Sequence, residues 1–315
     1  MTTISAGREN GNNPDRSVAP RRRPVLPDAW LATLFIAPSV LILALMVFYP
    51  FVTLIRYSLL SFSMLRPDVA PVHVGLGNYI DLLTDKQIWQ RFVFTGKFVL
   101  ATLSIQFVIG IAAAYAFHHD FRGRDILFTI ALMPMMFCPI VVGFLWQYMF
   151  NSQWGLVNWL ISLIGVGKID WLGVPTHALW AVAIADAWTW TPFVILLATA
   201  AFRGIPRDIL ESAQVDGASP TYTFFRVTLP MSLPIILIAF LLRLIDAFKQ
   251  FDLFVAMTGG GPGSETETAA YSLSKMAFGY FQTGKASAFA IILLVIILGL
   301  SMVFVRNLTS LSNRV

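Results

Sequence analysis

Four charged residues recur at three-residue intervals inside one apolar segment of the chain, Arg243, Asp246, Lys249 and Asp252. Residues i and i+3 are neighbours on a helix surface, so these side chains would form a ladder of alternating sign. A charge within a bilayer is costly unless it is paired or faces a polar cavity. The ladder therefore either compensates its own charges or lines a solute path through Asp246 and Lys249, and the two roles can coexist.

A second polar stretch, Asp186 to Phe193, sets an acid and two indole rings beside a proline within another apolar segment. Aromatic faces together with a few placed polar groups are typical of small-molecule sites, and they suit sugars. The indoles of Trp188 and Trp190 also fit packing against lipid or at the membrane interface. Asp186 is harder to explain as a lipid-facing residue, so the stretch is a candidate lining of a carbohydrate path.

The connection 203–230 is predicted to form two short helices joined by a tight turn. Pro206 suits the first position of the first helix, and Gly217 suits a left-handed C-terminal cap. Ser219-Pro220 then begins a second helix, which we expect Pro230 to end. The result would be a rigid protrusion that the groove of a partner protein could grip.

The elements that carry these residues are membrane-spanning helices. Hydrophobic residues make up 57% of the 315 and charged ones 12%, against about 25% charged in soluble domains, and the mean hydropathy is +0.72. About 20 apolar residues cross the hydrocarbon core as a helix. Six stretches are long enough, and they are 30–55, 92–117, 126–150, 177–202, 231–257 and 286–305. We therefore expect an all-α polytopic membrane protein with six transmembrane helices.

The basic residues are distributed as membrane topology requires. Twelve Lys and Arg lie in the N-terminal tail, the turns 118–125 and 203–230 and the C-terminal tail, against seven in the other connections. Because cytoplasmic loops carry the excess, both termini are predicted to be cytoplasmic. Residues 1–25 are polar and predicted to be a disordered cytoplasmic tail, followed by a transmembrane domain over 26–315. The basic residues form no stripe with interleaved aromatics, so nucleic acid is not an expected partner, and no set of metal ligands is evident.

The string Glu211-x-Ala213-x-x-Asp216-Gly217-Ala218, with Leu229 and Pro230 downstream, resembles the cytoplasmic signature loop of ABC-importer permeases. Ser212 stands where that loop usually has Ala, which preserves a small side chain. Further similar landmarks are Phe48-Tyr49-Pro50, Gly75 to Tyr79, Gly155 to Asn158 and Met257 to Pro262. Together they make the chain similar to the first permease subunit of maltose-type carbohydrate importers, a family whose solutes are oligosaccharides, sugar alcohols or glycerol phosphates.

That resemblance implies a type I importer permease fold whose 203–230 loop contains a coupling helix. The residues that it implies for coupling to the ATPase are Glu211, Ala213, Asp216, Gly217 and Ala218. The residues that it implies for the solute path are Asp186, Thr189, Trp190, Phe193 and Gln250, and Met135 falls in a proline-flanked lining segment. This segment has one residue more between its prolines than the maltose-type protein.

The resemblance further implies the partners and the location. They are a second permease subunit, two copies of an ABC ATPase, an extracytoplasmic solute-binding protein and the lipid of a bacterial cytoplasmic membrane. ATP and Mg²⁺ would bind to the ATPase subunits, so no cofactor and no enzymatic activity are expected in this chain. Two alternatives are a stand-alone proton-coupled transporter that uses Asp186 and the ladder, and a membrane-embedded enzyme with Asp186 or Asp246 as acid. Neither alternative needs a docking helix in 203–230.

Overall fold

The computed structural model describes residues 28–66 and 68–312. The predicted tail of residues 1–25 lies outside them. Helix α1 (Asp28–Ser58) is apolar along its length and contains Pro38 and Pro50. The described residues divide after Val52 into two compact units, and no residue in the most apolar window of α1 is buried.

The connection after α1 contains the β-structure of the described residues. Strands β1 (Leu60–Ser61) and β2 (Val72–His73) pair antiparallel. Helix α2 (Gly77–Thr84) follows, and the Asn78 side-chain amide donates to the carbonyls of Ser58 and Leu60 at 2.8 and 3.0 Å. The all-helical prediction is therefore right for the spans and omits this small ribbon.

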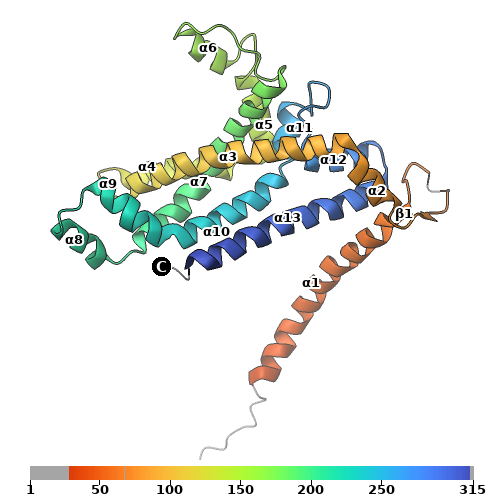
Figure 1. The fold of residues 1–315 in the computed structure, drawn as a ribbon, viewed down its shortest axis with the longest axis horizontal. Coiled ribbons are helices and arrows are strands. Elements are labelled where there is room, and N and C mark those ends of the chain that lie inside the picture. The colour runs from red at the N-terminus through yellow and green to blue at the C-terminus, as the bar shows by residue number, and fades with distance from the viewer. Residues whose placement is uncertain (1–27, 67, 313–315) are drawn as a thin grey trace, which may run out of the picture. The chain divides into compact units, whose positions relative to one another are not determined.

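Four long helices run side by side through the main body (Figure 1). They are α3 (Lys86–His118), α7 (Pro175–Arg203), α10 (Leu229–Phe248) and α13 (Thr283–Ser312). Small residues let α3 and α7 approach closely. A Cβ atom added to Gly110 of α3 would lie 2.7 Å from a methyl carbon of Val194, and most alanines of α7 are fully buried.

The predicted span 126–150 is broken into segments. Helix α4 (Arg124–Leu132), the 3-10 turn η1 (Met133–Met136) and helix α5 (Pro139–Met149) meet at a bend of 98°. Phe137 and Cys138 are extended between the two arms, because proline removes a helix donor and biases the residue before it away from helical geometry. The described residues therefore contain five helices able to span a membrane, or six if the bent pair forms one span.

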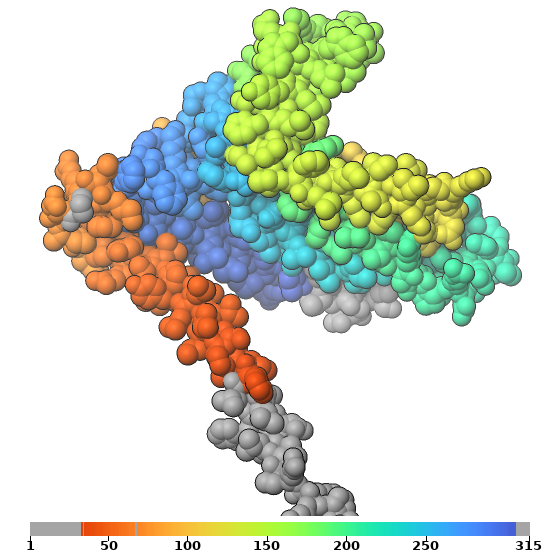
Figure 2. Space-filling model, turned by 180° about the vertical axis from the view of Figure 1, so that it is seen from behind, coloured from red at the N-terminus to blue at the C-terminus, as the bar shows by residue number. Residues whose placement is uncertain are grey.

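The remaining elements are shorter. They are α6 (Leu156–Ser162), α8 (Arg207–Val215), α9 (Pro220–Thr223), the π-turn η2 (Phe224–Thr228), α11 (Asp252–Met257), α12 (Ala269–Ser274) and the π-turn η3 (Lys275–Gly279). Helices α8 and α9 lie at one end, whereas β1, α2 and α12 lie at the other (Figure 1). The segment around α5 and α6 stands out from the body in the space-filling view (Figure 2).

Candidate functional site

Asp186 is the centre of a buried polar network in the middle of α7. Its side chain is 1% exposed. The carboxylate oxygen Oδ2 accepts hydrogen bonds from Thr102 Oγ1 at 2.6 Å and from Gln106 Nε2 at 2.8 Å. Both donors lie on α3 and are fully buried. A buried carboxylate is stable only when its oxygens are paired and hydrogen-bonded, so these contacts tie α7 to α3.

Arg243 on α10 completes the network from a third helix. Its Nη2 lies 2.9 Å from Asp186 Oδ2, and its Nε donates to Gln106 Oε1 at 3.0 Å. The guanidinium carbon lies 4.8 Å from the centre of the Trp190 ring. Because the Arg243 side chain is only 2% exposed, the ion pair and the cation–π contact both lie in a low-dielectric environment.

The predicted ladder is confirmed in part. Arg243 lies 2.5 Å from Asp246 as the spacing predicts, and it has a further partner outside the ladder, Asp186. The prediction that all four residues share one helix is wrong, because α10 ends at Phe248 and α11 begins at Asp252. Lys249 Nζ lies 3.9 Å from Asp246 Oδ1, and their side chains are 56% and 48% exposed. An exposed pair at this distance contributes little to stability.

Gln250 occupies the break between α10 and α11 and connects it to Asp186. Its Nε2 donates to Asp186 Oδ1 at 3.1 Å, while its Oε1 accepts from the Phe251 backbone N–H at 3.1 Å. The side-chain amide thus satisfies a backbone donor that the interrupted helix leaves free. Gln250 and Trp190 are both half-buried, whereas Asp186 is buried.

The other predicted path residues lie in different surroundings. Thr189 is buried, and its hydroxyl donates to the Ala185 carbonyl at 2.9 Å on the same helix. Phe193 is half-buried with its ring 6.5 Å from that of Trp190. Met135 is half-buried in η1 at the bend of the third span. The structure therefore brings together Asp186, Trp190, Asp246 and Gln250, with Phe193 next to Trp190.

The two indoles of the α7 stretch have different partners. Trp188 lies on the α4–α5 side, where its ring is 6.2 Å from Phe137 and 6.1 Å from Trp146. Trp190 instead lies under Arg243. Of this pair, Trp190 is therefore the indole that belongs to the charged network.

The sequence analysis missed Thr102 and Gln106, which are four residues apart on α3. Polar residues at i and i+4 within an apolar span lie on one helix face and are rarely lipid-facing. That spacing was the available signal. Gln106 joins both charges of the Asp186–Arg243 pair, which only tertiary packing reveals.

A second buried acid, Glu267, anchors the connection 257–285 and was also missed. Its carboxylate, 2% exposed, lies 3.1 Å from Arg91 of α3 and 2.7 Å from Lys275. The Ser272 hydroxyl donates to it at 3.2 Å. The hydrogen bond with Glu267 is the main reason that the pKa of Lys275 is raised from its ordinary value. These contacts hold the connection 257–285 against the N-terminal end of α3.

The predicted coupling loop has the expected local geometry. Gly217 has φ +74°, and the helix α8 ends with Gly217 N–H bonded to Gln214 and Ala218 N–H bonded to Ala213, both at 3.0 Å. This pair of bonds is the Schellman C-cap that a left-handed glycine permits. Glu211 and Asp216 are exposed, while Ala213 and Ala218 are half-buried.

Two details of this loop differ from the prediction. Pro206 is the N-cap of α8 and not its first residue. The second helix does begin at Pro220 with Ser219 as a side-chain cap, but Pro230 does not end it. The π-turn η2 carries the helix from Thr223 into α10, with Leu229 N–H bonded to the Phe224 carbonyl. A π-turn widens the helix locally, and here it ends two residues before Pro230, which cannot donate a backbone hydrogen bond.

The chain belongs to the family of binding-protein-dependent transport system inner membrane components, which matches residues 106–312. That family and the helical fold define a multi-pass membrane permease, and the chain is accordingly a permease subunit of an ABC importer and not an enzyme.

Relatives and solved structures agree with this assignment. The chain is 36% identical over 236 residues to the trehalose/maltose transport system permease protein MalF of Thermococcus litoralis, covering 74% of this chain and 79% of that protein. It is 28% identical over 288 residues to the sn-glycerol-3-phosphate transport system permease protein UgpA of Yersinia enterocolitica, covering 90% and 96%. A chain of a bacterial ABC transporter involved in alginate import has a similar fold, with a TM-score of 0.77, 20% identity and coverage of 90% and 96%.

Proposed function

We propose that this permease moves a carbohydrate or a related polyol across the bacterial cytoplasmic membrane by alternating access. The solute would be delivered by an extracytoplasmic binding protein and released into the cell. This proposal is supported by relatives whose names include trehalose, maltose and glycerol 3-phosphate permeases. Their family favours an ATP-driven importer over a proton-coupled transporter or a membrane enzyme.

The site that best suits such a solute is the break between α10 and α11. Gln250 offers an amide there, Trp190 offers an aromatic face, and both are half-buried. The buried pair Asp186–Arg243, at 2.9 Å, positions both side chains. Asp186 accepts a hydrogen bond from Gln250, and Arg243 makes a cation–π contact with Trp190. A few placed polar groups beside aromatic rings are what orient a hydroxylated ligand. This arrangement is the observation that carries the proposed solute path.

The charges around this site favour an uncharged solute. Arg243 is compensated by Asp186 and Asp246, and Lys249 lies 3.9 Å from Asp246. The four groups are formally neutral together, so no surplus cation would offset the desolvation of an anionic group. We therefore favour a neutral sugar or polyol over a phosphate ester.

The exposed helix α8 supports ATP coupling through separate subunits. It lies at the end of the body opposite to β1, α2 and α12 (Figure 1), and the Schellman cap at Gly217 makes it a rigid protrusion. We propose that Glu211, Ala213, Asp216, Gly217 and Ala218 contact one of two ATPase subunits, which bind ATP and Mg²⁺. This chain would pair with a second permease, hold no cofactor itself, and have both termini and the 203–230 loop in the cytoplasm.

Uptake by the complete importer in proteoliposomes tests the proposal. Radiolabelled neutral disaccharides and glycerol 3-phosphate would be offered with the cognate binding protein and internal ATP. Gln250→Ala should lower uptake by up to about tenfold while the complex still assembles, because a hydrogen bond between neutral groups contributes roughly 0.5–1.5 kcal/mol. Trp190→Ala removes the aromatic face and should also lower uptake. Lys168→Gln, in another connection, is the control and should transport normally. Uptake that collapses with a proton uncoupler and persists without ATP would refute the ATP-driven assignment.

A further inference from the structure

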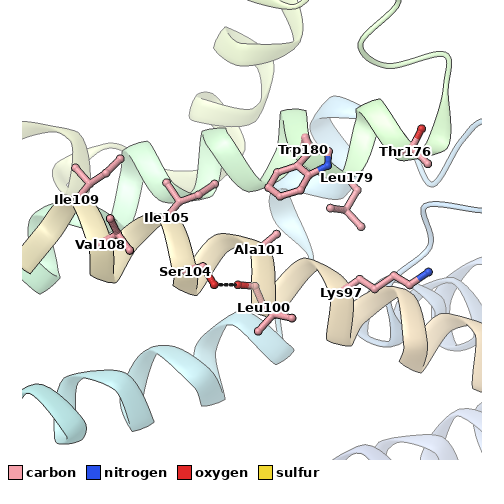
Figure 3. Close-up of a pocket in the computed structure, with 10 residues that line it drawn as sticks. All are labelled: Lys97, Leu100, Ala101, Ser104, Ile105, Val108, Ile109, Thr176, Leu179 and Trp180. Carbon is pink, nitrogen blue, oxygen red and sulfur yellow. Dashed lines mark hydrogen bonds between the residues drawn. The ribbon is translucent and has the colours of Figure 1, made fainter.

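An open apolar groove of about 790 Å³ lies between α3 and α7 (Figure 3). It is distinct from the buried Asp186 network, none of whose members line it. Its walls include Leu100, Ile105, Val108, Ile109, Leu179 and Trp180. Leu100 and Val108 are 72% and 71% exposed, so within the described residues these side chains have little cover.

The walls offer almost no polar group to an occupant. Ser104 lies halfway along the groove, but its hydroxyl donates to the Leu100 carbonyl of its own helix at 2.7 Å (Figure 3). A serine in this arrangement is already satisfied and does not need a partner from the groove. The groove therefore suits a hydrocarbon chain and not a hydroxylated solute.

One end of the groove carries a positive charge. Lys97 is exposed there, and within residues 28–66 and 68–312 it takes part in no ion pair or hydrogen bond. A second hollow of about 650 Å³ continues from this end and is lined by Lys86, Arg91, Glu265 and Glu267. In this hollow Arg91 and Glu267 are paired at 3.1 Å, whereas Lys86, Lys97 and Glu265 form no ion pair within the described residues. Of these charged residues, Lys97 is the one that also lines the groove.

Lys97 lies close to the extracytoplasmic end of the predicted span 92–117, five residues from its start. From Lys97 to the end of α3 at His118, the helix rises about 30 Å at 1.5 Å per residue, which is the thickness of the hydrocarbon core. From Leu100 to Ile109 the groove extends about 14 Å in the same direction, which is close to the depth of one leaflet. The groove is thus one leaflet deep, with a cation at headgroup level.

We propose that the α3–α7 groove binds an anionic glycerophospholipid. One acyl chain lies along Leu100, Ile105 and Val108, and the phosphate pairs with Lys97. On the orientation proposed above, the lipid belongs to the extracytoplasmic leaflet. A purely apolar helix from a partner protein would cover the same side chains but would leave Lys97 unpaired, whereas an anionic headgroup satisfies both the groove and its charge.

Native mass spectrometry of the purified complete importer tests this site. The detergent-solubilised complex would be titrated with phosphatidylglycerol and, separately, with phosphatidylcholine. Lys97→Gln should weaken phosphatidylglycerol binding about fivefold, since one basic residue near the headgroups contributes about 1 kcal/mol. It should weaken phosphatidylcholine binding less, because the choline cation of that lipid offsets the charge of its phosphate. Ser104→Trp fills the groove and should reduce the binding of both lipids. Lys168→Gln removes another lysine far from the groove and should change neither.

Equal phosphatidylglycerol binding by wild type and Lys97→Gln would overturn the proposal. So would an equal loss in Lys168→Gln, because the effect would then be one of general surface charge. A photo-crosslinking amino acid at Val108 provides an independent readout that requires no folding-sensitive variant. A lipid adduct supports the site, whereas an adduct with the second permease would show that a protein helix occupies the groove instead.

Discussion

The Asp186–Arg243 pair should contribute far more to stability than the exposed charges three to six residues away from Arg243. The two side chains are 1% and 2% exposed and 2.9 Å apart. Removal of one partner from such a pair leaves an unpaired buried charge and costs on the order of 3–5 kcal/mol. Arg243→Gln would strand Asp186 in this way, because the remaining donors Thr102, Gln106 and Gln250 are neutral.

Lys249→Gln is the matched control. Its side chain is 56% exposed and lies 3.9 Å from Asp246, so its loss should cost less than about 1 kcal/mol. The double variant Asp186→Asn with Arg243→Gln removes both buried charges and should recover part of the lost stability. Residues in direct contact typically couple by about 0.5–3 kcal/mol.

The thermal denaturation midpoint of the complex, followed by intrinsic fluorescence in one detergent, measures these differences. Chains of 150–250 residues shift by about 2–4 °C per kcal/mol, so Arg243→Gln should lower the midpoint by at least about 5 °C and Lys249→Gln by less. Two results would show that the buried pair does not stabilise the contact between α7 and α10. One is an equal fall in midpoint for Arg243→Gln and Lys249→Gln, and the other is a double variant with a lower midpoint than Asp186→Asn and Arg243→Gln alone.

Three further predictions concern topology, coupling and pH. Cysteines introduced at Ser219 and Ser264 of a Cys138→Ser background should react with membrane-impermeant reagents from opposite sides, and labelling from the same side would contradict the topology. Gly217→Val forces a β-branched residue into φ +74°, at a cost of about 1–2 kcal/mol, although its Cβ would meet no atom within 4 Å. Assembled complexes should then lose ATPase stimulation and transport, and normal uptake would contradict the coupling role. Lys275→Gln should lower the denaturation midpoint relative to wild type. This difference in midpoint should be largest below pH 10.5 and should disappear as the pH rises through the higher pKa that Lys275 has in the folded protein. A difference that persists above that pH range would show that the charge of Lys275 is not involved.

The long spans were predictable because the length of an apolar run is set by the bilayer itself. The predicted stretches 92–117, 177–202 and 286–305 fall within α3, α7 and α13. The 98° bend in 126–150 was not predictable from its prolines alone. Proline often only kinks a helix, and here two consecutive extended residues, Phe137 and Cys138, turn the chain through a much larger angle.

The coupling loop was largely predictable because its determinants are local. Gly217 and Ser219 act through hydrogen bonds within a few residues of themselves. Pro230 was interpreted by the same local rules and did not end its helix. The π-turn before it depends on how 224–228 packs, with the Phe224 ring 4.5 Å from that of Tyr115 on α3, and no short-range pattern gives that contact.

The charged network shows where spacing alone misleads. The three-residue interval gave Arg243 and Asp246 as neighbours, which they are. It could not reveal that Asp186 lies opposite Arg243, because that contact depends on how α7 packs against α10. Gln250, identified by resemblance, does contact Asp186.

Site-directed cross-linking tests whether helix α8 connects this permease to an ATPase. Glu211→Cys in a Cys138→Ser background would be combined with single cysteines around the permease-binding groove of the partner ATPase, and a short bifunctional maleimide added to membranes. Glu211 is exposed on α8, so we expect a permease–ATPase adduct whose yield changes with ATP, and none from Ser264→Cys at the other end of the molecule. Equal adducts from both positions, or an adduct from Ser264→Cys alone, would contradict it.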